Sequence, residues 1–125
     1  MAQVTNSAHN AELWWEIDAF TRELKAGETA ESIKQQPAIA ATREAYKRCG
    51  KDPSRYRPSA EALRRRLMRG LELYQIDTLV DLINLVSLRT GYSIGGFDAD
   101  KIQGDSLELG IGRAEEPSKA SGAER

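Results

Sequence analysis

The first third of the chain carries an apolar pattern with helical spacing. Apolar residues recur at steps of three or four, which places them on one face of a helix. Asn10 is a suitable N-cap residue, and Gly27 stands where helices commonly end. The pattern therefore predicts a helix over residues 10–26. The residues of its apolar face are Leu13, Ile17, Phe20 and Leu24.

Further helices are predicted from capping residues and helix breakers. They cover a short stretch after Thr29 and residues 37–50, 59–69 and 78–90. The last of these is apolar on nearly all sides, which predicts a central and largely covered helix. Between the predicted helices at 37–50 and 59–69, residues 52–58 contain two prolines among polar residues, a pattern typical of an ordered, turn-rich loop.

Beyond Gly91 the pattern changes from helical to extended. Apolar and other residues alternate over residues 106–111, which predicts a half-buried strand. With extended segments near residues 71–76 and 92–97, this strand predicts a small, incomplete sheet. The expected fold class is α+β, with a helix-rich N-terminal part packed on that sheet.

One domain is expected, flanked by two less regular segments. Residues 1–9 are polar and predict a flexible N-terminus, whereas residues 10–112 carry the periodic patterns of the domain. Residues 113–125 contain no periodicity and almost no large apolar side chain, which predicts a disordered tail.

Composition narrows the class of protein without identifying it. The 125 residues include 40% hydrophobic and 30% charged residues, with a net charge of −1, as in an ordinary globular domain. Cys49 is the single cysteine, so one chain cannot form a disulfide. No stretch resembles a signal peptide or a membrane span, and we expect a soluble, cytoplasmic protein.

The near-zero net charge conceals a basic central block. Residues 47–69 contain nine basic and two acidic side chains, whereas both flanks are acidic. Such a block is suited to neutralising phosphates, which makes it a candidate RNA-binding region. Alternatively, the arginines at 64, 65, 66 and 69 form the solvated face of one helix and pair with the acidic flanks. The candidate RNA-binding residues are Lys51, Arg55, Arg57, Arg64, Arg65 and Arg69.

The sequence offers little conventional catalytic chemistry. His9 is the single histidine and lies in a polar N-terminal segment, and Cys49 has no histidine partner near it in the sequence. No phosphate-binding loop motif and no two-histidine metal spacing is present. We therefore assign no catalytic residue, no metal and no cofactor.

Three segments resemble the editing and tRNA-binding domain, of the B3/4 type, of the phenylalanyl-tRNA synthetase beta chain. They are residues 46–63, 78–91 and 95–102, the first centred on Gly50-Lys51-Asp52-Pro53-Ser54-Arg55-Tyr56-Arg57. The likeness runs from about Glu12 to Gly112 and is closest to stand-alone relatives of that domain. It implies an α/β fold with a pocket that removes tyrosine wrongly attached to the phenylalanine tRNA.

The chain also departs from the family pattern. Gly95 and Gly96 stand where bacterial synthetases commonly have a histidine and a small residue. The glycine-rich, glutamate-containing segment that completes the family's pocket has no counterpart, which suggests a partial or truncated domain. The residues that the resemblance assigns to what remains of the aminoacyl-end pocket are Asn84, Ser93, Gly95, Gly96 and Asp98.

The resulting hypothesis is a module that binds tRNA or aminoacyl-tRNA, without a membrane partner. Two alternatives stay open at this point. One is an aminoacyl-tRNA esterase that edits in trans and completes its pocket by forming a homodimer. The other is a truncated product without function.

Overall fold

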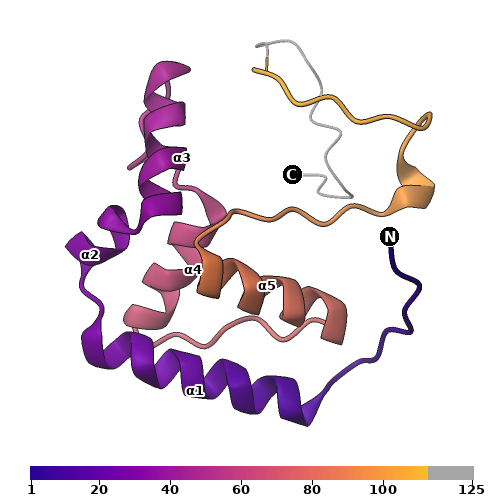
Figure 1. The fold of residues 1–125 in the computed structure, drawn as a ribbon, viewed down its shortest axis with the longest axis horizontal. Coiled ribbons are helices and arrows are strands. Elements are labelled where there is room, and N and C mark those ends of the chain that lie inside the picture. The colour runs from indigo at the N-terminus through magenta and orange to yellow at the C-terminus, as the bar shows by residue number, and fades with distance from the viewer. Residues whose placement is uncertain (113–125) are drawn as a thin grey trace. The chain divides into compact units, whose positions relative to one another are not determined.

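The computed structural model describes residues 1–112, which divide into a unit of residues 1–94 and a unit that begins at Gly95. Each unit is described by itself. The helices of the first unit are α1 (Ala11–Gly27), α2 (Ala30–Gln35), α3 (Pro37–Arg48), α4 (Ser59–Met68) and α5 (Thr78–Thr90) (Figure 1). The described part of the second unit contains one short 3-10 helix, η1 (Ala99–Lys101).

The predicted N-cap of α1, Asn10, is confirmed, whereas Gly27 is the last residue of α1 and Glu28 is its C-cap. The Asn10 side chain accepts a hydrogen bond from the Leu13 amide at 2.9 Å, and the Asp77 side chain accepts one from Val80 at 2.9 Å. At the other end of α5, Gly91 adopts the left-handed conformation, with φ of 77°. These signals act within a few residues of the helix end, so the sequence alone identifies them.

The N-terminal segment completes the cap of α5, which the sequence analysis did not anticipate. The Ser7 carbonyl accepts a hydrogen bond from the Thr78 amide at 2.9 Å, and the Asn6 side chain accepts one from Leu79 at 3.0 Å. Together with the Asp77 cap, these bonds satisfy three amide groups in the first turn of α5, which have no partner within the helix.

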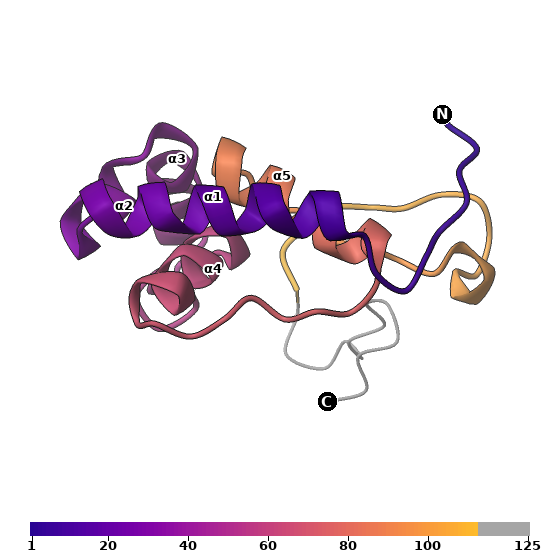
Figure 2. The same ribbon diagram turned by 90° about the horizontal axis from the view of Figure 1, so that it is seen from below.

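Helix α1 packs against α4 and α5 and covers the main core. Figure 1 places α1 along the lower edge of the view, and Figure 2 shows it in front of the other helices. A second, smaller cluster joins Ile33, Ile39 and Ala60, and Met68 contacts both clusters. Helix α5 is less covered than expected, because Leu82 and Val86 remain about two-fifths exposed. The buried residues of the main core are Ile17, Leu24, Leu67, Leu73, Leu85 and Leu88.

Asp81 is the polar exception at the centre of the helical unit. Its side chain is fully buried, and its two oxygens accept hydrogen bonds from the Trp14 indole at 3.2 Å and the Ile76 amide at 3.1 Å. A buried carboxylate needs such partners. Asp81 thereby joins α1, α5 and the connector that precedes α5.

The α+β prediction is wrong, since residues 1–112 contain helices and no strand. The connector at residues 71–76 is extended but has no partner strand, and the segment at 92–97 forms no ladder either. In the predicted strand at 106–111, Leu107, Leu109 and Ile111 are 68%, 101% and 70% exposed. Alternation marks two faces of an extended chain, but a strand also needs a hydrogen-bonded neighbour, which these segments lack.

Gly91 lies where the ends of two helices meet. The Gln36 side chain accepts a hydrogen bond from the Ile39 amide at 2.9 Å and donates one to the Thr90 carbonyl at 2.9 Å. A Cβ atom on Gly91 would lie 2.2 Å from the Gln36 side-chain oxygen, so that side chain would have to leave. A single glycine therefore allows Gln36 to connect α3 with α5.

We expect Gly91→Ala to lower the free energy of unfolding by about 2–3 kcal/mol, from left-handed strain and the loss of both Gln36 hydrogen bonds. Gly70→Ala is the matched control, because Gly70 has the same φ of 77° with nothing within 4 Å of its added Cβ. The control isolates the backbone strain, about 1 kcal/mol. Urea unfolding measures both, and equal losses would exclude the role of Gln36.

Candidate nucleic-acid interface

The loop between α3 and α4 consists of residues 49–58, and its segment at 52–58 contains turns, as predicted. The Tyr56 amide donates to the Asp52 carbonyl at 2.9 Å, and the Ser54 amide donates to the Asp52 side chain at 2.9 Å. Pro53 and Pro58, which fix the backbone on either side of the basic residues, are buried. The loop therefore holds its side chains on a defined backbone.

Glu61 in the first turn of α4 is fully buried and surrounded by arginines. Arg43 donates to both of its oxygens, at 2.7 and 3.0 Å, and the Arg65 Nε donates at 2.9 Å. The Arg57 Nε lies 3.7 Å from the same carboxylate. One negative charge thus binds three cations, and the cluster of Glu61 with Arg43, Arg57 and Arg65 keeps an excess of positive charge.

Arg43 extends this cluster into the loop. Its guanidinium donates to the Pro53 carbonyl at 3.3 Å and to the Ser54 hydroxyl at 3.0 Å, in addition to Glu61. Since Glu61 fixes Arg43 and Arg43 fixes residues 53 and 54, the buried carboxylate holds the loop in place. These roles of Arg43 and Glu61 could not be identified from the sequence, because Arg43 lies outside the basic block and Glu61 counts there only as a negative charge.

Arg64, a predicted RNA-binding residue, is buried inside the helical unit. It forms an ion pair with Glu28 at 3.0 Å and donates to the Leu88 carbonyl near the end of α5. Its Nε is buried without a partner among the described residues. Arg64 therefore joins three segments of the fold and does not face solvent.

The two following arginines also make internal contacts. Arg65 is 15% exposed and binds Glu61, and one of its Nη groups reaches the Ala30 carbonyl at 3.5 Å. Arg66 donates to the Glu72 carbonyl at 2.6 Å and stacks on the Tyr74 ring, with 3.9 Å between guanidinium carbon and ring centroid. The basic helix face of the sequence analysis is largely engaged within the fold.

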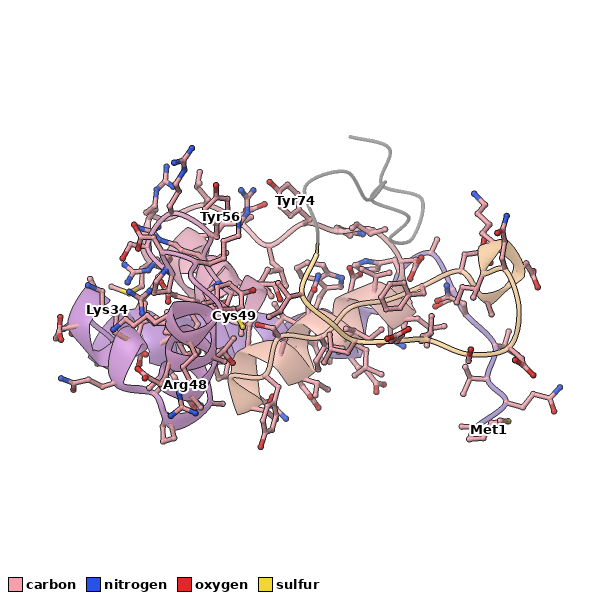
Figure 3. The ribbon with its side chains drawn as sticks, turned by 90° about the horizontal axis from the view of Figure 1, so that it is seen from above. Met1, Lys34, Arg48, Cys49, Tyr56 and Tyr74 are labelled. Carbon is pink, nitrogen blue, oxygen red and sulfur yellow. The ribbon has the colours of Figure 1, made fainter. Side chains whose placement is uncertain are left out.

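Other cations of the block remain accessible, and two of them flank Tyr56. The Lys51 amine lies 4.9 Å and the Arg55 guanidinium 5.4 Å from the centroid of the Tyr56 ring, which is 46% exposed. Within residues 1–112, Lys51, Arg55 and Arg69 form no ion pair. Figure 3 labels Tyr56 at the surface, with nitrogen-tipped side chains beside it. Arg57 is 45% exposed, and Arg69 lies at the opposite end of α4.

The residues predicted for the aminoacyl-end pocket belong to two units. Asn84 is half-buried on α5. The Ser93 hydroxyl accepts a hydrogen bond from the Ala60 amide at 3.2 Å and so caps α4, whose N-cap residue, Pro58, has no side-chain acceptor. In the second unit, Gly95 and Gly96 have ordinary φ angles, and the Asp98 side chain accepts from the Asp100 amide at 3.0 Å. Ser93 thus caps the N-terminus of α4, and Asp98 caps the N-terminus of η1.

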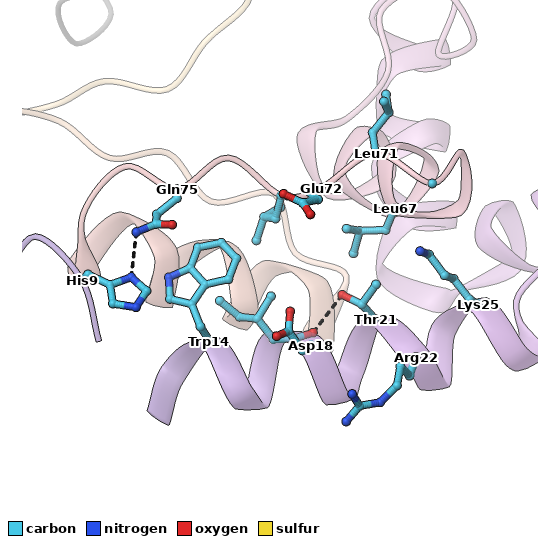
Figure 4. Close-up of a pocket in the computed structure, with 13 residues that line it drawn as sticks. His9, Trp14, Asp18, Thr21, Arg22, Lys25, Leu67, Leu71, Glu72 and Gln75 are labelled. Carbon is cyan, nitrogen blue, oxygen red and sulfur yellow. Dashed lines mark hydrogen bonds between the residues drawn. The ribbon is translucent and has the colours of Figure 1, made fainter. Parts of the chain in front are cut away.

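A groove of about 520 Å³ lies between α1 and residues 67–75 (Figure 4). The sequence did not predict it. Trp14 and His9 stack at one end of it, with 6.4 Å between ring centroids. Its rim carries acidic Asp18 and Glu72 as well as basic side chains, so its charge does not favour a polyanion. Of the predicted apolar face of α1, only Ile17 lines this groove, and the sequence did not show the path of the connector that closes it.

The comparisons with known proteins identify one family. The B3/4 domain model matches residues 41–125, which is more than half of the chain. The chain belongs to the B3/4 domain family. This domain is found in the phenylalanyl-tRNA synthetase beta chain, so the resemblance of the sequence to the B3/4 domain is confirmed. The search of curated proteins and the search of solved structures gave no match.

The B3/4 match covers the arginine cluster but not the whole helical unit. It begins at Ala41 inside α3, later than the sequence resemblance at Glu12, and includes Arg43, Glu61 and the loop at residues 49–58. It also runs through residues 113–125, the predicted tail, which lies outside the described residues. No helix of residues 1–112 is long and apolar enough to cross a membrane.

Proposed function

We propose that this B3/4 domain is a tRNA-binding module related to the phenylalanyl-tRNA synthetase beta chain. One observation carries the proposal: accessible cations gather on the ordered loop at residues 49–58, inside the region that matches the family. Phosphate contacts dominate the affinity of proteins for RNA, and they require cations that are not already neutralised. Lys51 and Arg55 meet that condition among the described residues.

The six candidate residues differ in exposure, and we divide them into two groups on that ground. We assign phosphate contacts to Lys51, Arg55, Arg57 and Arg69, which are exposed. Arg64 and Arg65 instead hold the fold, through Glu28 and Glu61 respectively. Binding rather than hydrolysis is proposed, because the side-chain oxygens of Ser93 and Asp98 accept hydrogen bonds from backbone amides at helix ends.

The first test is the salt dependence of tRNA binding. We expect the triple variant Lys51→Gln, Arg55→Gln, Arg69→Gln to lose about tenfold or more in affinity at moderate salt. The slope of log affinity against log salt should fall by about 2–3, because each of the three lost phosphate contacts removes about 0.7–0.9 from it. None of the three residues forms an ion pair within residues 1–112, so the fold should persist.

A matched control removes three positive charges elsewhere. Arg22→Gln, Lys25→Gln, Lys34→Gln changes the net charge equally, at exposed positions of α1 and α2. We expect this control to keep most of the affinity and nearly the parent slope. Equal losses in the two triple variants would show that only net charge matters, and they would remove the assignment to the loop.

A further inference from the structure

We propose that the Tyr56 loop, residues 51–57, binds an unpaired nucleotide, with the Tyr56 ring stacked on its base and Lys51 and Arg55 on the adjoining phosphates. This inference rests on the proposed function and specifies which part of an RNA the loop recognises. The chemical class is single-stranded nucleic acid, which has bases free to stack.

The first support is the combination of ring and cations at one place. Tyr56 is 46% exposed and has two cationic side chains within 6 Å of its centroid, at 4.9 and 5.4 Å. An aromatic platform beside a positively charged track is the arrangement with which proteins bind single strands irrespective of sequence. The loop has one acidic residue, Asp52, and one of its oxygens already accepts from the Ser54 amide.

The other exposed aromatic residues lack this combination. The Tyr74 ring is covered by Arg66, whose guanidinium also bonds the Tyr74 hydroxyl at 3.1 Å and the Glu72 carbonyl at 2.6 Å. Within residues 1–112, no cationic side chain lies over Tyr92, Trp15 or Phe97, although all three are well exposed. Tyr56 therefore differs from the other exposed aromatic residues in its accessible nearby cations, and not merely in exposure.

The second support is that internal hydrogen bonds hold the loop backbone in place. Its backbone is tied by the Tyr56 amide to Asp52 at 2.9 Å, and Arg43 holds Pro53 and Ser54 against the buried Glu61. A preorganised loop loses little conformational entropy on binding, so stacking energy appears as affinity. An exposed ring on a mobile loop would not have this advantage.

The geometry predicts selectivity for single strands over duplexes. Bases inside an RNA helix are stacked on each other and cannot cover the Tyr56 ring, whereas unpaired ends and loops can. Cations contact both forms. Stacking and charge therefore make separable contributions, one limited to single strands and the other measured by the salt slope.

The experiment compares a short single-stranded oligouridylate with a blunt RNA duplex of equal phosphate number. Tyr56→Leu should weaken binding of the single strand by about 5- to 150-fold, the range measured for one stacked base. It should change duplex binding less than about twofold and leave the salt slope unchanged. Tyr56→Phe and Tyr56→Trp should restore single-strand binding, because both keep an aromatic face.

Tyr92→Leu is the matched control, since it removes an exposed tyrosine ring with no cation over it in the described part of the chain. We expect parent-like binding from this variant. A second measurement needs no variant: photo-cross-linking of the parent to a 5-bromouridine oligonucleotide should map to Tyr56. Cross-links confined to other residues would overturn the inference.

The outcomes separate this inference from the proposed function. Salt-dependent binding by the parent, with Tyr56→Leu equal to the parent on the single strand, would overturn stacking and retain tRNA binding. Equal losses by Tyr56→Leu on single strand and duplex would also overturn it, because stacking requires a free base. Failure of the parent to bind any RNA, tRNA included, would overturn both.

Discussion

Replacing Glu61 by alanine is expected to lower the free energy of unfolding by about 3–5 kcal/mol. The substitution leaves Arg43 and Arg65, whose side chains are 12% and 15% exposed, without the carboxylate that binds both. Burying an uncompensated charge is among the costliest effects of a single substitution, and here two guanidinium groups are affected. Natural domains are stable by about 5–15 kcal/mol, so this loss could unfold the chain at moderate temperature.

Thermal and urea unfolding measure this loss, and two further variants define its origin. Glu44→Ala removes an exposed carboxylate that lies 3.7 Å from Arg48, and we expect a change within about 0.5 kcal/mol. The double variant Arg43→Met, Glu61→Leu should be more stable than Glu61→Ala, because it replaces opposite charges with apolar groups. If Glu61→Ala unfolds like Glu44→Ala, Glu61 does not hold the cluster.

The sequence predicts the helices because their signals are local. Asn10, Asp77 and Gly91 each determine a helix end through contacts within four residues, and the three-to-four spacing of α1 identifies its buried face. The ordered loop at 52–58 follows in the same way from the fixed backbone of two prolines. Such features need no knowledge of which segments meet.

The lack of a sheet in residues 1–112 and the internal contacts of Arg64 and Arg65 could not be predicted, because they depend on distant partners. Leu107, Leu109 and Ile111 alternate like a strand, but alternation does not specify a neighbouring strand. The environment of Glu61 depends on Arg43, eighteen positions earlier, in a different helix. From composition, Glu61 is only one negative charge within a basic block. In the fold, Glu61 is the carboxylate that Arg43 and Arg65 bind.

Arg64 illustrates the same limit. In sequence it is one of four nearby arginines on a helix, yet it is buried and linked to Glu28 and Leu88, while Arg69 is exposed. We expect Arg64→Ala to cost about 3–4 kcal/mol, since it leaves a cavity, an unpaired Leu88 carbonyl and a partly buried Glu28.

The matched control is Arg69→Ala, which removes the same group from the exposed end of α4 and should change stability by less than about 0.5 kcal/mol. In RNA binding, substitution of Arg69 should have the larger effect and substitution of Arg64 the smaller one. Arg69→Ala lowers the salt slope by about 0.7–0.9, whereas Arg64→Met, which fills the same space without the charge, leaves the slope of the folded protein unchanged. A parent-like melting temperature for Arg64→Ala, together with a reduced slope for Arg64→Met, would instead place Arg64 on the RNA.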